Sequence, residues 1–213
     1  MADKINFINN IPLPVPERKI YSRLGHNRYL TEMSAAQRKK IESAISRGVS
    51  LCRLRGVWRR FEIKERTEEQ IEFGDGNIFA SRKLAELLKD SGSLVLFAVT
   101  AGTDIVAGAE ELAAHSDGVG ALTYDAVGSE MVDAAAEWIQ QYLNRQLKRG
   151  NEILTKRRFS PGYGDLDLKN QALLFKLLEI EKLGVKLTKD FLMLPEKTVT
   201  AIAGIQKIEN RVI

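Results

Sequence analysis

The hydrophobic positions along the chain recur at two different spacings, which predicts both helices and strands. Steps of three and four residues indicate helices over the ranges 34–47, 82–89, 104–115, 119–148 and 168–182. Alternating or continuous apolar residues indicate strands over the ranges 56–63, 71–73, 77–79 and 93–100. One or two further strands are expected after residue 185. Because no regular strand–helix–strand repeat is present, we expect an α+β fold in which flanking helices cover a mixed or antiparallel twisted sheet.

Short polar motifs predict where several of these elements begin and end. Ser34-Ala-Ala-Gln37 is a capping-box pattern, and Gly48 suits the position just past the end of the same helix. Ser81 and Asp167 are expected to cap the helices that follow them. Gly74-Asp75-Gly76 predicts the turn of a β-hairpin between two short strands.

The first thirty residues are expected to form an extended arm. Pro12, Pro14 and Pro16 alternate with apolar residues, and each proline fixes its φ angle and lacks an N–H donor. We therefore interpret residues 1–213 as a single domain, with residues 1–30 as an arm that packs along this domain or along a partner.

The composition narrows the class of protein. The 213 residues are 44% hydrophobic and 28% charged, which is ordinary usage for a globular protein. Cys52 is the single cysteine, and His26 and His115 are the two histidines, so neither an internal disulfide nor a zinc site is expected. The start of the chain has no signal-peptide pattern, and apolar runs fall short of the ~18 residues of a membrane span. We expect a cytoplasmic protein with no membrane partner.

A basic cluster raises the question of nucleic acid. The net charge of +4 permits an anionic partner without requiring one. In residues 53–61, "RLRGVWRRF", arginines and aromatics alternate, and such a strand can grip a phosphate backbone and stack a base. No nucleic-acid-binding signature accompanies it, and solvated arginines with core aromatics are the commoner arrangement. A basic RNA-binding module therefore stays only as an alternative of another class, and no nucleic-acid partner is expected.

The segment 156–165, "KRRFSPGYGD", contains the best candidate for a ligand site. An arginine offers a planar fork of five donors that suits a carboxylate or a phosphate. Gly162 and Gly164 allow a backbone to approach a ligand closely, and Tyr163 offers a flat ring and a hydroxyl. The same residues also suit a plain turn that leads into a capped helix, and such turns are common.

The last third of the chain resembles the activation (reactivation) domain of cobalamin-dependent methionine synthase. Arg158, Gly162 and Tyr163 match the Arg-x-x-x-Gly-Tyr motif of that family. The further matching residues are Leu177, Leu178, Glu179, Glu181, Gly184, Leu187, Thr188, Phe191, Met193, Pro195, Thr198, Val199 and Thr200. The resemblance extends more weakly to residues 128–149, to Arg23-Leu24-Gly25 and to "LFAVTAGTDI". The whole chain is therefore expected to be a free-standing form of this domain.

The resemblance implies a function as well as a fold. Family members bind S-adenosylmethionine and support the reductive methylation of cobalamin that has oxidised to the inactive cobalt(II) state. The expected protein is the reactivation component of a split cobalamin-dependent methionine synthase, and thus a subunit of a methyltransferase. Its partner holds the cobalamin, and a flavodoxin-like protein is the expected electron donor. The alternative within this class is an accessory partner of another corrinoid methyltransferase system.

The resemblance also implies roles for particular residues. Arg158 would pair with the carboxylate of the methionine moiety. Gly162 and Tyr163 would hold the adenine and ribose side, with Pro161 and Gly164 as neighbouring binding residues.

Two acidic residues match family positions near the sulfonium and amino groups of the ligand. Glu152 precedes the motif, and Asp133 lies on the expected long helix. A carboxylate beside these cationic groups is electrostatically favourable. The chain departs from larger family members in its last strand, where Ile202, Ala203 and Gly204 stand at the positions of an aromatic residue that contacts the ligand.

Overall fold

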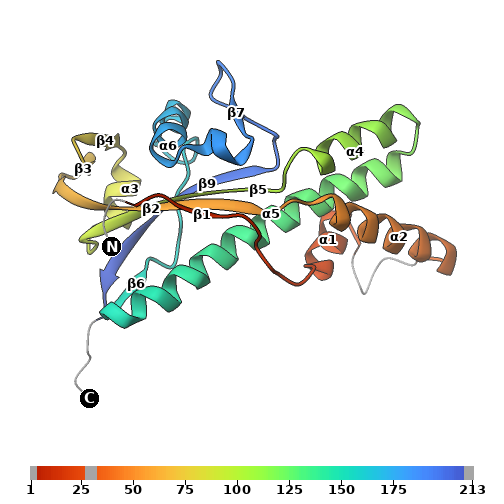
Figure 1. Cartoon of the computed structure of the whole chain (residues 1–213), viewed down its shortest axis with the longest axis horizontal. Helices are drawn as coiled ribbons and strands as arrows, with labels where there is room; N and C mark the ends of the chain where they lie inside the picture. Colours follow the sequence, from red (N-terminus) through yellow and green to blue (C-terminus); the bar gives the residue numbers. More distant parts are fainter. Residues whose placement is uncertain (1–3, 27–32, 209–213) are drawn as a thin grey trace.

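The computed structural model describes residues 4–26 and 33–208. Within these ranges, a seven-stranded antiparallel sheet lies between the long helix α5 on one face and α3 and α6 on the other (Figure 1). The helices are α1 (Glu17–Arg23), α2 (Ala35–Leu51), α3 (Arg82–Leu87), α4 (Asp104–Ala114), α5 (Gly118–Leu147) and α6 (Gln171–Leu178). Short 3₁₀ turns are η1 (Lys148–Gly150), η2 (Leu168–Asn170) and η3 (Ile180–Leu183). The strands are β1 (Asn6–Ile8), β2 (Arg55–Arg66), β3 (Gln70–Phe73), β4 (Asn77–Ala80), β5 (Ser93–Thr100), β6 (Glu152–Leu154), β7 (Lys186–Leu187), β8 (Met193–Leu194) and β9 (Thr198–Lys207).

The strand order confirms the predicted α+β class and decides in favour of an antiparallel sheet. The order is β4-β3-β2-β5-β9-β6, and β1 adds to the first residues of β2. The strands β7 and β8 form a separate small hairpin. The predicted turn at Gly74-Asp75-Gly76 joins β3 to β4, as expected from its sequence.

The burial of the central strand β5 explains its run of apolar residues. All eight of its residues are buried, and its side chains alternate between two hydrophobic clusters. Val95, Phe97 and Val99 pack in the cluster that contains α5, whereas Leu94 and Leu96 pack in the cluster that contains α3 and α6. Because both faces are covered, residues 94–99 are all apolar, and only the end residues Ser93 and Thr100 are polar.

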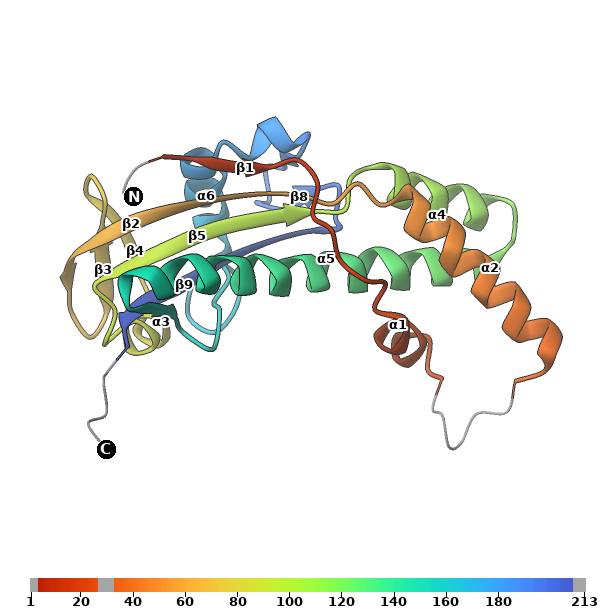
Figure 2. The same ribbon diagram turned by 60° about the horizontal axis from the view of Figure 1, so that its bottom comes forward.

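A helical lobe extends beyond one end of the sheet. Helices α2 and α4 pack on the first half of α5, whose thirty residues span about 45 Å and continue under the sheet (Figure 2). The predicted capping box is present at Ser34 and Gln37, but the helix runs on to Leu51. Gly48 therefore lies inside α2 and not past its end. A Cβ at this position would lie 3.3 Å from the ring of Tyr124, so the glycine allows α2 and α5 to pack closely.

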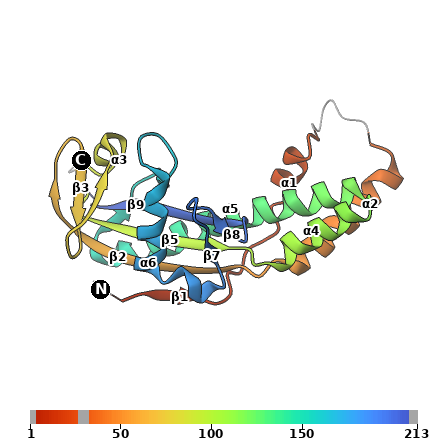
Figure 3. The same ribbon diagram turned by 90° about the horizontal axis from the view of Figure 1, so that it is seen from above.

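The N-terminal arm packs on this chain and is only partly extended. Strand β1 pairs with β2 (Figure 3), and the backbone N–H of Ile11 donates to the carbonyl of Leu54 at 3.1 Å. The expectation of an extended arm is wrong over Glu17–Arg23, which form α1 with Ile20 fully buried. Prolines that precede a helix do not remove its internal hydrogen bonds, so Pro16 is compatible with this start. Residues 1–3 and 27–30 of the expected arm lie outside the described residues.

The predicted helix over 168–182 is divided in the structure. Asp167 caps the 3₁₀ turn η2 by accepting a hydrogen bond from the backbone N–H of Lys169 at 2.8 Å. Helix α6 then ends where Glu179 adopts a left-handed conformation with φ of 50°. Strand β6 was not predicted, and the tail contributes β7, β8 and β9. Among the described residues, no helix is long and apolar enough to cross a bilayer.

The arginines of the basic cluster contact the chain's own backbone and carboxylates. Arg55 Nη2 donates to the carbonyl of Leu183 at 2.6 Å, and Arg59 Nη1 donates to that of Leu177 at 3.3 Å. These two arginines satisfy carbonyls at the ends of η3 and α6, where helical backbone acceptors lack intrahelical partners. The expected solvated face of this strand is therefore an internal anchoring surface.

Candidate functional site

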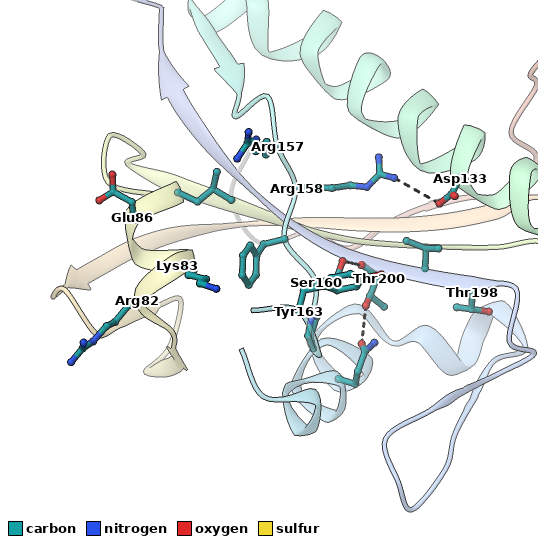
Figure 4. A pocket seen from close by; sticks show the side chains of 15 residues that line it. Arg82, Lys83, Glu86, Asp133, Arg157, Arg158, Ser160, Tyr163, Thr198 and Thr200 are labelled. Carbon is teal, nitrogen blue, oxygen red and sulfur yellow. Dashed lines mark hydrogen bonds and ion pairs between the residues drawn. The ribbon is translucent and has the colours of Figure 1, made fainter. Parts of the chain in front are cut away.

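A cleft of about 1100 Å³ opens between α3, α5, the start of β9 and the segment that follows β6 (Figure 4). Its lining residues are Arg82, Lys83, Glu86, Leu87, Asp133, Arg157, Arg158, Phe159, Ser160, Pro161, Tyr163, Gln171, Thr198, Val199 and Thr200. Seven of the residues singled out from the sequence or its resemblance line the cleft: Asp133, Arg158, Pro161, Tyr163, Thr198, Val199 and Thr200.

The backbone of the motif segment is fixed along the edge of β9. The N–H of Phe159 donates to the carbonyl of Ile202 at 2.8 Å, and the N–H of Ile202 donates back at 2.7 Å. One residue further, Ser160 Oγ donates to the carbonyl of Thr200 at 2.7 Å. These hydrogen bonds hold the segment beside the sheet and so fix the backbone positions from which the neighbouring side chains extend.

The backbone of the segment 156–165 requires both of its glycines. Gly162 has φ of 88° and Gly164 has φ of 60°, which is the left-handed region that residues with a Cβ rarely adopt. A Cβ at Gly164 would also lie 2.9 Å from Lys83 Cδ. Between the glycines, Tyr163 is 71% exposed at the cleft. The turn therefore places a largely free aromatic ring where a ligand can reach it.

Asp165 joins this turn to helix α3. Its carboxylate accepts hydrogen bonds from Ser81 Oγ and, at 2.8 Å, from the backbone N–H of Arg82. The Ser81 hydroxyl is the main cause that lowers the pKa of Asp165 below its ordinary value. The contact brings α3 to the cleft, so Lys83 and its neighbours form a wall that sequence reasoning missed. No local signal links positions so far apart in the chain.

Arg158 is held in the cleft by two residues of α5. Its Nη1 donates to Gln140 Oε1 at 2.9 Å, and its Nη2 lies 3.8 Å from Asp133 Oδ1. Asp133 and Gln140 are about two helical turns apart and so lie on one face of α5. Arg158 retains 26% exposure of its side chain. The structure thus brings Arg158 and Asp133 together, and it adds Gln140, which sequence reasoning missed.

Glu152 does not join this cleft, in contrast to the expectation from the resemblance. It pairs with Lys207 in the β6–β9 register, seven residues along β9 from Thr200, which is about 23 Å at the rise of an extended strand. Its carboxylate accepts from Arg60 Nη1 and Nη2 at 2.8 and 3.2 Å and lies 3.3 Å from Lys207 Nζ. The Arg60 guanidinium is the main cause that lowers the pKa of Glu152.

The last strand contributes small polar side chains to the cleft in place of an aromatic one. Thr200 Oγ1 donates to Gln171 Oε1 at 2.8 Å, and both residues line the cleft. Ile202 and Ala203 are fully buried. At Gly204, a Cβ would lie 2.1 Å from Ser91 Oγ, so no aromatic side chain fits there.

Comparison with protein-family models decides the family of this chain. The model described as "Vitamin B12 dependent methionine synthase, activation domain" matches residues 82–207, which is more than half of the 213 residues. The chain belongs to this family. The matched range begins at the first residue of α3 and ends at the last residue of β9, so it includes every residue that lines the cleft.

A solved structure confirms the fold of this activation domain. The chain is similar to a crystal structure of the MetH reactivation domain bound to AdoHcy, with a TM-score of 0.68 and 18% sequence identity. The similarity covers 95% of this chain and 78% of that chain. The similarity therefore extends well beyond residues 82–207, the range of the family model. No curated protein matches the chain.

The chemistry that the activation domain's cleft offers is ionic and hydrogen-bonding. Arg158 and Asp133 present opposite charges side by side, which suits a zwitterionic group. In the part of the chain that the structure describes, no group of three or more His, Cys, Asp or Glu side chains could hold a metal ion. Burial raises the pKa of the Cys52 thiol to about 12, so Cys52 is unsuited to be a nucleophile.

Proposed function

We propose that this activation domain binds S-adenosylmethionine in the cleft and acts in the cytoplasm as the reactivation component of a cobalamin-dependent methionine synthase. The cobalamin is held by a partner, the cobalamin-binding part of the synthase, and a flavodoxin-like protein supplies electrons. The observation that carries this proposal is the position of Arg158 beside Asp133 in a cleft formed entirely by the family's matched range.

The charges of the ligand complement those of the cleft. The methionine moiety of S-adenosylmethionine carries a carboxylate, an ammonium and, next to them, the sulfonium. In this proposal the guanidinium of Arg158 binds the carboxylate through paired N–H donors. Asp133, whose side chain is 43% exposed, attracts the two cationic groups. The AdoHcy in the similar MetH structure supports a ligand of this kind here.

The remainder of the cleft has the properties needed for the adenosine end. Its volume of about 1100 Å³ is slightly above the usual range for small-molecule pockets, so the whole ligand fits. The exposed ring of Tyr163 offers a face for the adenine, and the left-handed φ of Gly162 shapes the turn that carries this ring. Pro161 and Gly164 flank this turn and fix its shape.

Catalysis by this chain then consists of binding and orientation. When bound, S-adenosylmethionine supplies the methyl group that, with one electron from the donor, returns the partner's cobalt(II) cobalamin to methylcobalamin and leaves S-adenosylhomocysteine. Arg158 and Asp133 fix the methionine end of the ligand, and Gln140 fixes Arg158. Holding two reactants in a productive geometry lowers the barrier without any acid or base from the protein.

Titration calorimetry of the purified chain with S-adenosylhomocysteine and S-adenosylmethionine tests the binding step. Arg158→Ala removes a charge-assisted contact, so we expect affinity to fall at least about tenfold, or about 1.4 kcal/mol. Lys156→Ala is the matched control, because Lys156 is exposed and lies outside the set of cleft-lining residues. No heat with the intact chain at millimolar ligand, or equal affinity in Arg158→Ala, would contradict the proposal.

A further inference from the structure

The end of the cleft next to α3 differs in charge from the end next to α5. Figure 4 places Arg82, Lys83, Glu86 and Arg157 on one side of the cleft and Asp133 on the other. The cleft is lined by four cationic side chains against two carboxylates, Glu86 and Asp133. The excess of positive charge therefore lies at the α3 end.

Of the four charged side chains at this end, Arg82 and Glu86 already form ion pairs. Arg82 Nη2 lies 2.6 Å from Glu69 Oε1, and Glu86 Oε1 lies 2.9 Å from Lys89 Nζ. Lys83 and Arg157, by contrast, form no ion pair with any residue in the described ranges. The α3 end thus presents two uncompensated cations to the cleft.

Both cations have a fixed attachment to the site. The aliphatic stem of Lys83 lies across Gly164, where a Cβ would be 2.9 Å from Lys83 Cδ and 3.1 Å from the ring of Phe159. The backbone of Arg157 is held because its carbonyl accepts from Thr155 Oγ1 at 2.8 Å. Lys83 therefore lies near the flat ring of Phe159, and the backbone of Arg157 is anchored two residues before Phe159.

We infer that Lys83 and Arg157 form a phosphate-ester subsite at the α3 end of the cleft. Arginine binds phosphate through its planar fork and lysine binds it as a point charge, and two cations match the one to two negative charges of the group. This inference rests on the proposed function, because S-adenosylmethionine has a single anionic group and that group is assigned to Arg158. The subsite then takes a phosphate that S-adenosylmethionine does not supply. Its source is a free nucleotide or the phosphodiester in the nucleotide tail of the partner's cobalamin.

Calorimetry with inorganic pyrophosphate tests the subsite directly. We expect pyrophosphate to bind in the presence of saturating S-adenosylhomocysteine, with affinity that falls as salt is added. Lys83→Ala and Arg157→Ala should each weaken binding about fivefold or more, since each removes one charge-assisted contact. Arg82→Ala is the matched control and should change affinity less than about twofold, because Glu69 already pairs with Arg82. No binding at millimolar pyrophosphate, or equal affinity in Lys83→Ala and Arg157→Ala, overturns the inference.

Two pairs of ligands identify the source of the phosphate. Adenosine diphosphate is compared with adenosine, and hydroxocobalamin is compared with cobinamide, which lacks the nucleotide tail. Tighter binding of the phosphate-bearing member, lost in Lys83→Ala, supports the inference and names the source. Equal binding within both pairs overturns it. If pyrophosphate binds but S-adenosylhomocysteine does not, the proposed function fails and the anion subsite stands. If S-adenosylhomocysteine binds but pyrophosphate does not, the subsite is refuted and the proposed function stands.

Discussion

Gly204 lies where three parts of the fold come together, and its replacement by alanine should destabilise the protein. A Cβ at this position would lie 2.1 Å from Ser91 Oγ, 2.6 Å from Leu88 Cδ2 and 2.9 Å from Thr155 Cγ2. Leu88 and Ser91 follow helix α3, whereas Thr155 directly precedes the segment 156–165. An added methyl group therefore pushes against both walls that position the cleft.

The size of the stability loss in Gly204→Ala follows from the number of neighbouring atoms that must move. All three distances are shorter than those that Cβ atoms make in folded proteins, and the neighbours lie on different elements, so one rotamer change cannot relieve them. A shift of β9 would also strain the hydrogen bond from Gly204 N–H to Thr155 Oγ1 at 3.0 Å. Overpacking of a core costs roughly 1–3 kcal/mol, and we expect Gly204→Ala to lie near 3 kcal/mol.

Urea unfolding followed by circular dichroism measures this loss. Gly92→Ala is the matched control, because no heavy atom of the described chain lies within 4 Å of a Cβ built there. We expect that variant to stay within about 1 kcal/mol of the wild type, and any change to be stabilising. If Gly204→Ala were as stable as wild type within about 0.5 kcal/mol, the close packing of α3 on β9 would be refuted.

Three further predictions concern single contacts. Gln140→Ala should weaken S-adenosylhomocysteine binding several-fold at unchanged Tm, because Arg158 loses its acceptor, and Gln140→Glu should retain binding. Glu152→Gln should lower the free energy of unfolding, measured with urea at neutral pH, by about 1–2 kcal/mol. Because Arg60 lowers the pKa of Glu152, the wild type should lose this extra stability as the pH falls through that lowered pKa. Ser34→Ala removes the capping box of α2 and should cost about 1 kcal/mol, again by urea unfolding.

The features predicted well from the sequence depend on residues that are close together in it. The apolar run of β5, the hairpin turn at 74–76 and the capping box at Ser34 each need only a few neighbouring residues, and each is present in the structure. Gly48 was misplaced because its reason is not local. It allows two helices to cross, and that crossing involves Tyr124.

The residues of the candidate site show the same difference between local signals, which the sequence reveals, and contacts across the fold, which it does not. The motif indicated Arg158, Gly162 and Tyr163, because their spacing within one loop is readable. The α3 wall could not be predicted, since it depends on the contact of Asp165 with Ser81 across the fold. Glu152 precedes Arg158 closely in sequence, yet the antiparallel pairing of β6 with the far end of β9 separates them.

Transfer of a labelled methyl group shows directly whether this chain supports the methylation of cobalamin. The chain is mixed with a cobalamin-binding methionine synthase module that carries cobalt(II) cobalamin, a reductant and S-adenosylmethionine labelled in its methyl group. We expect label on the cobalamin, with an equal amount of S-adenosylhomocysteine, when the wild-type chain is present, and at least about tenfold slower transfer with Arg158→Ala. Transfer at the same rate without the chain, or with Arg158→Ala in its place, would contradict the account.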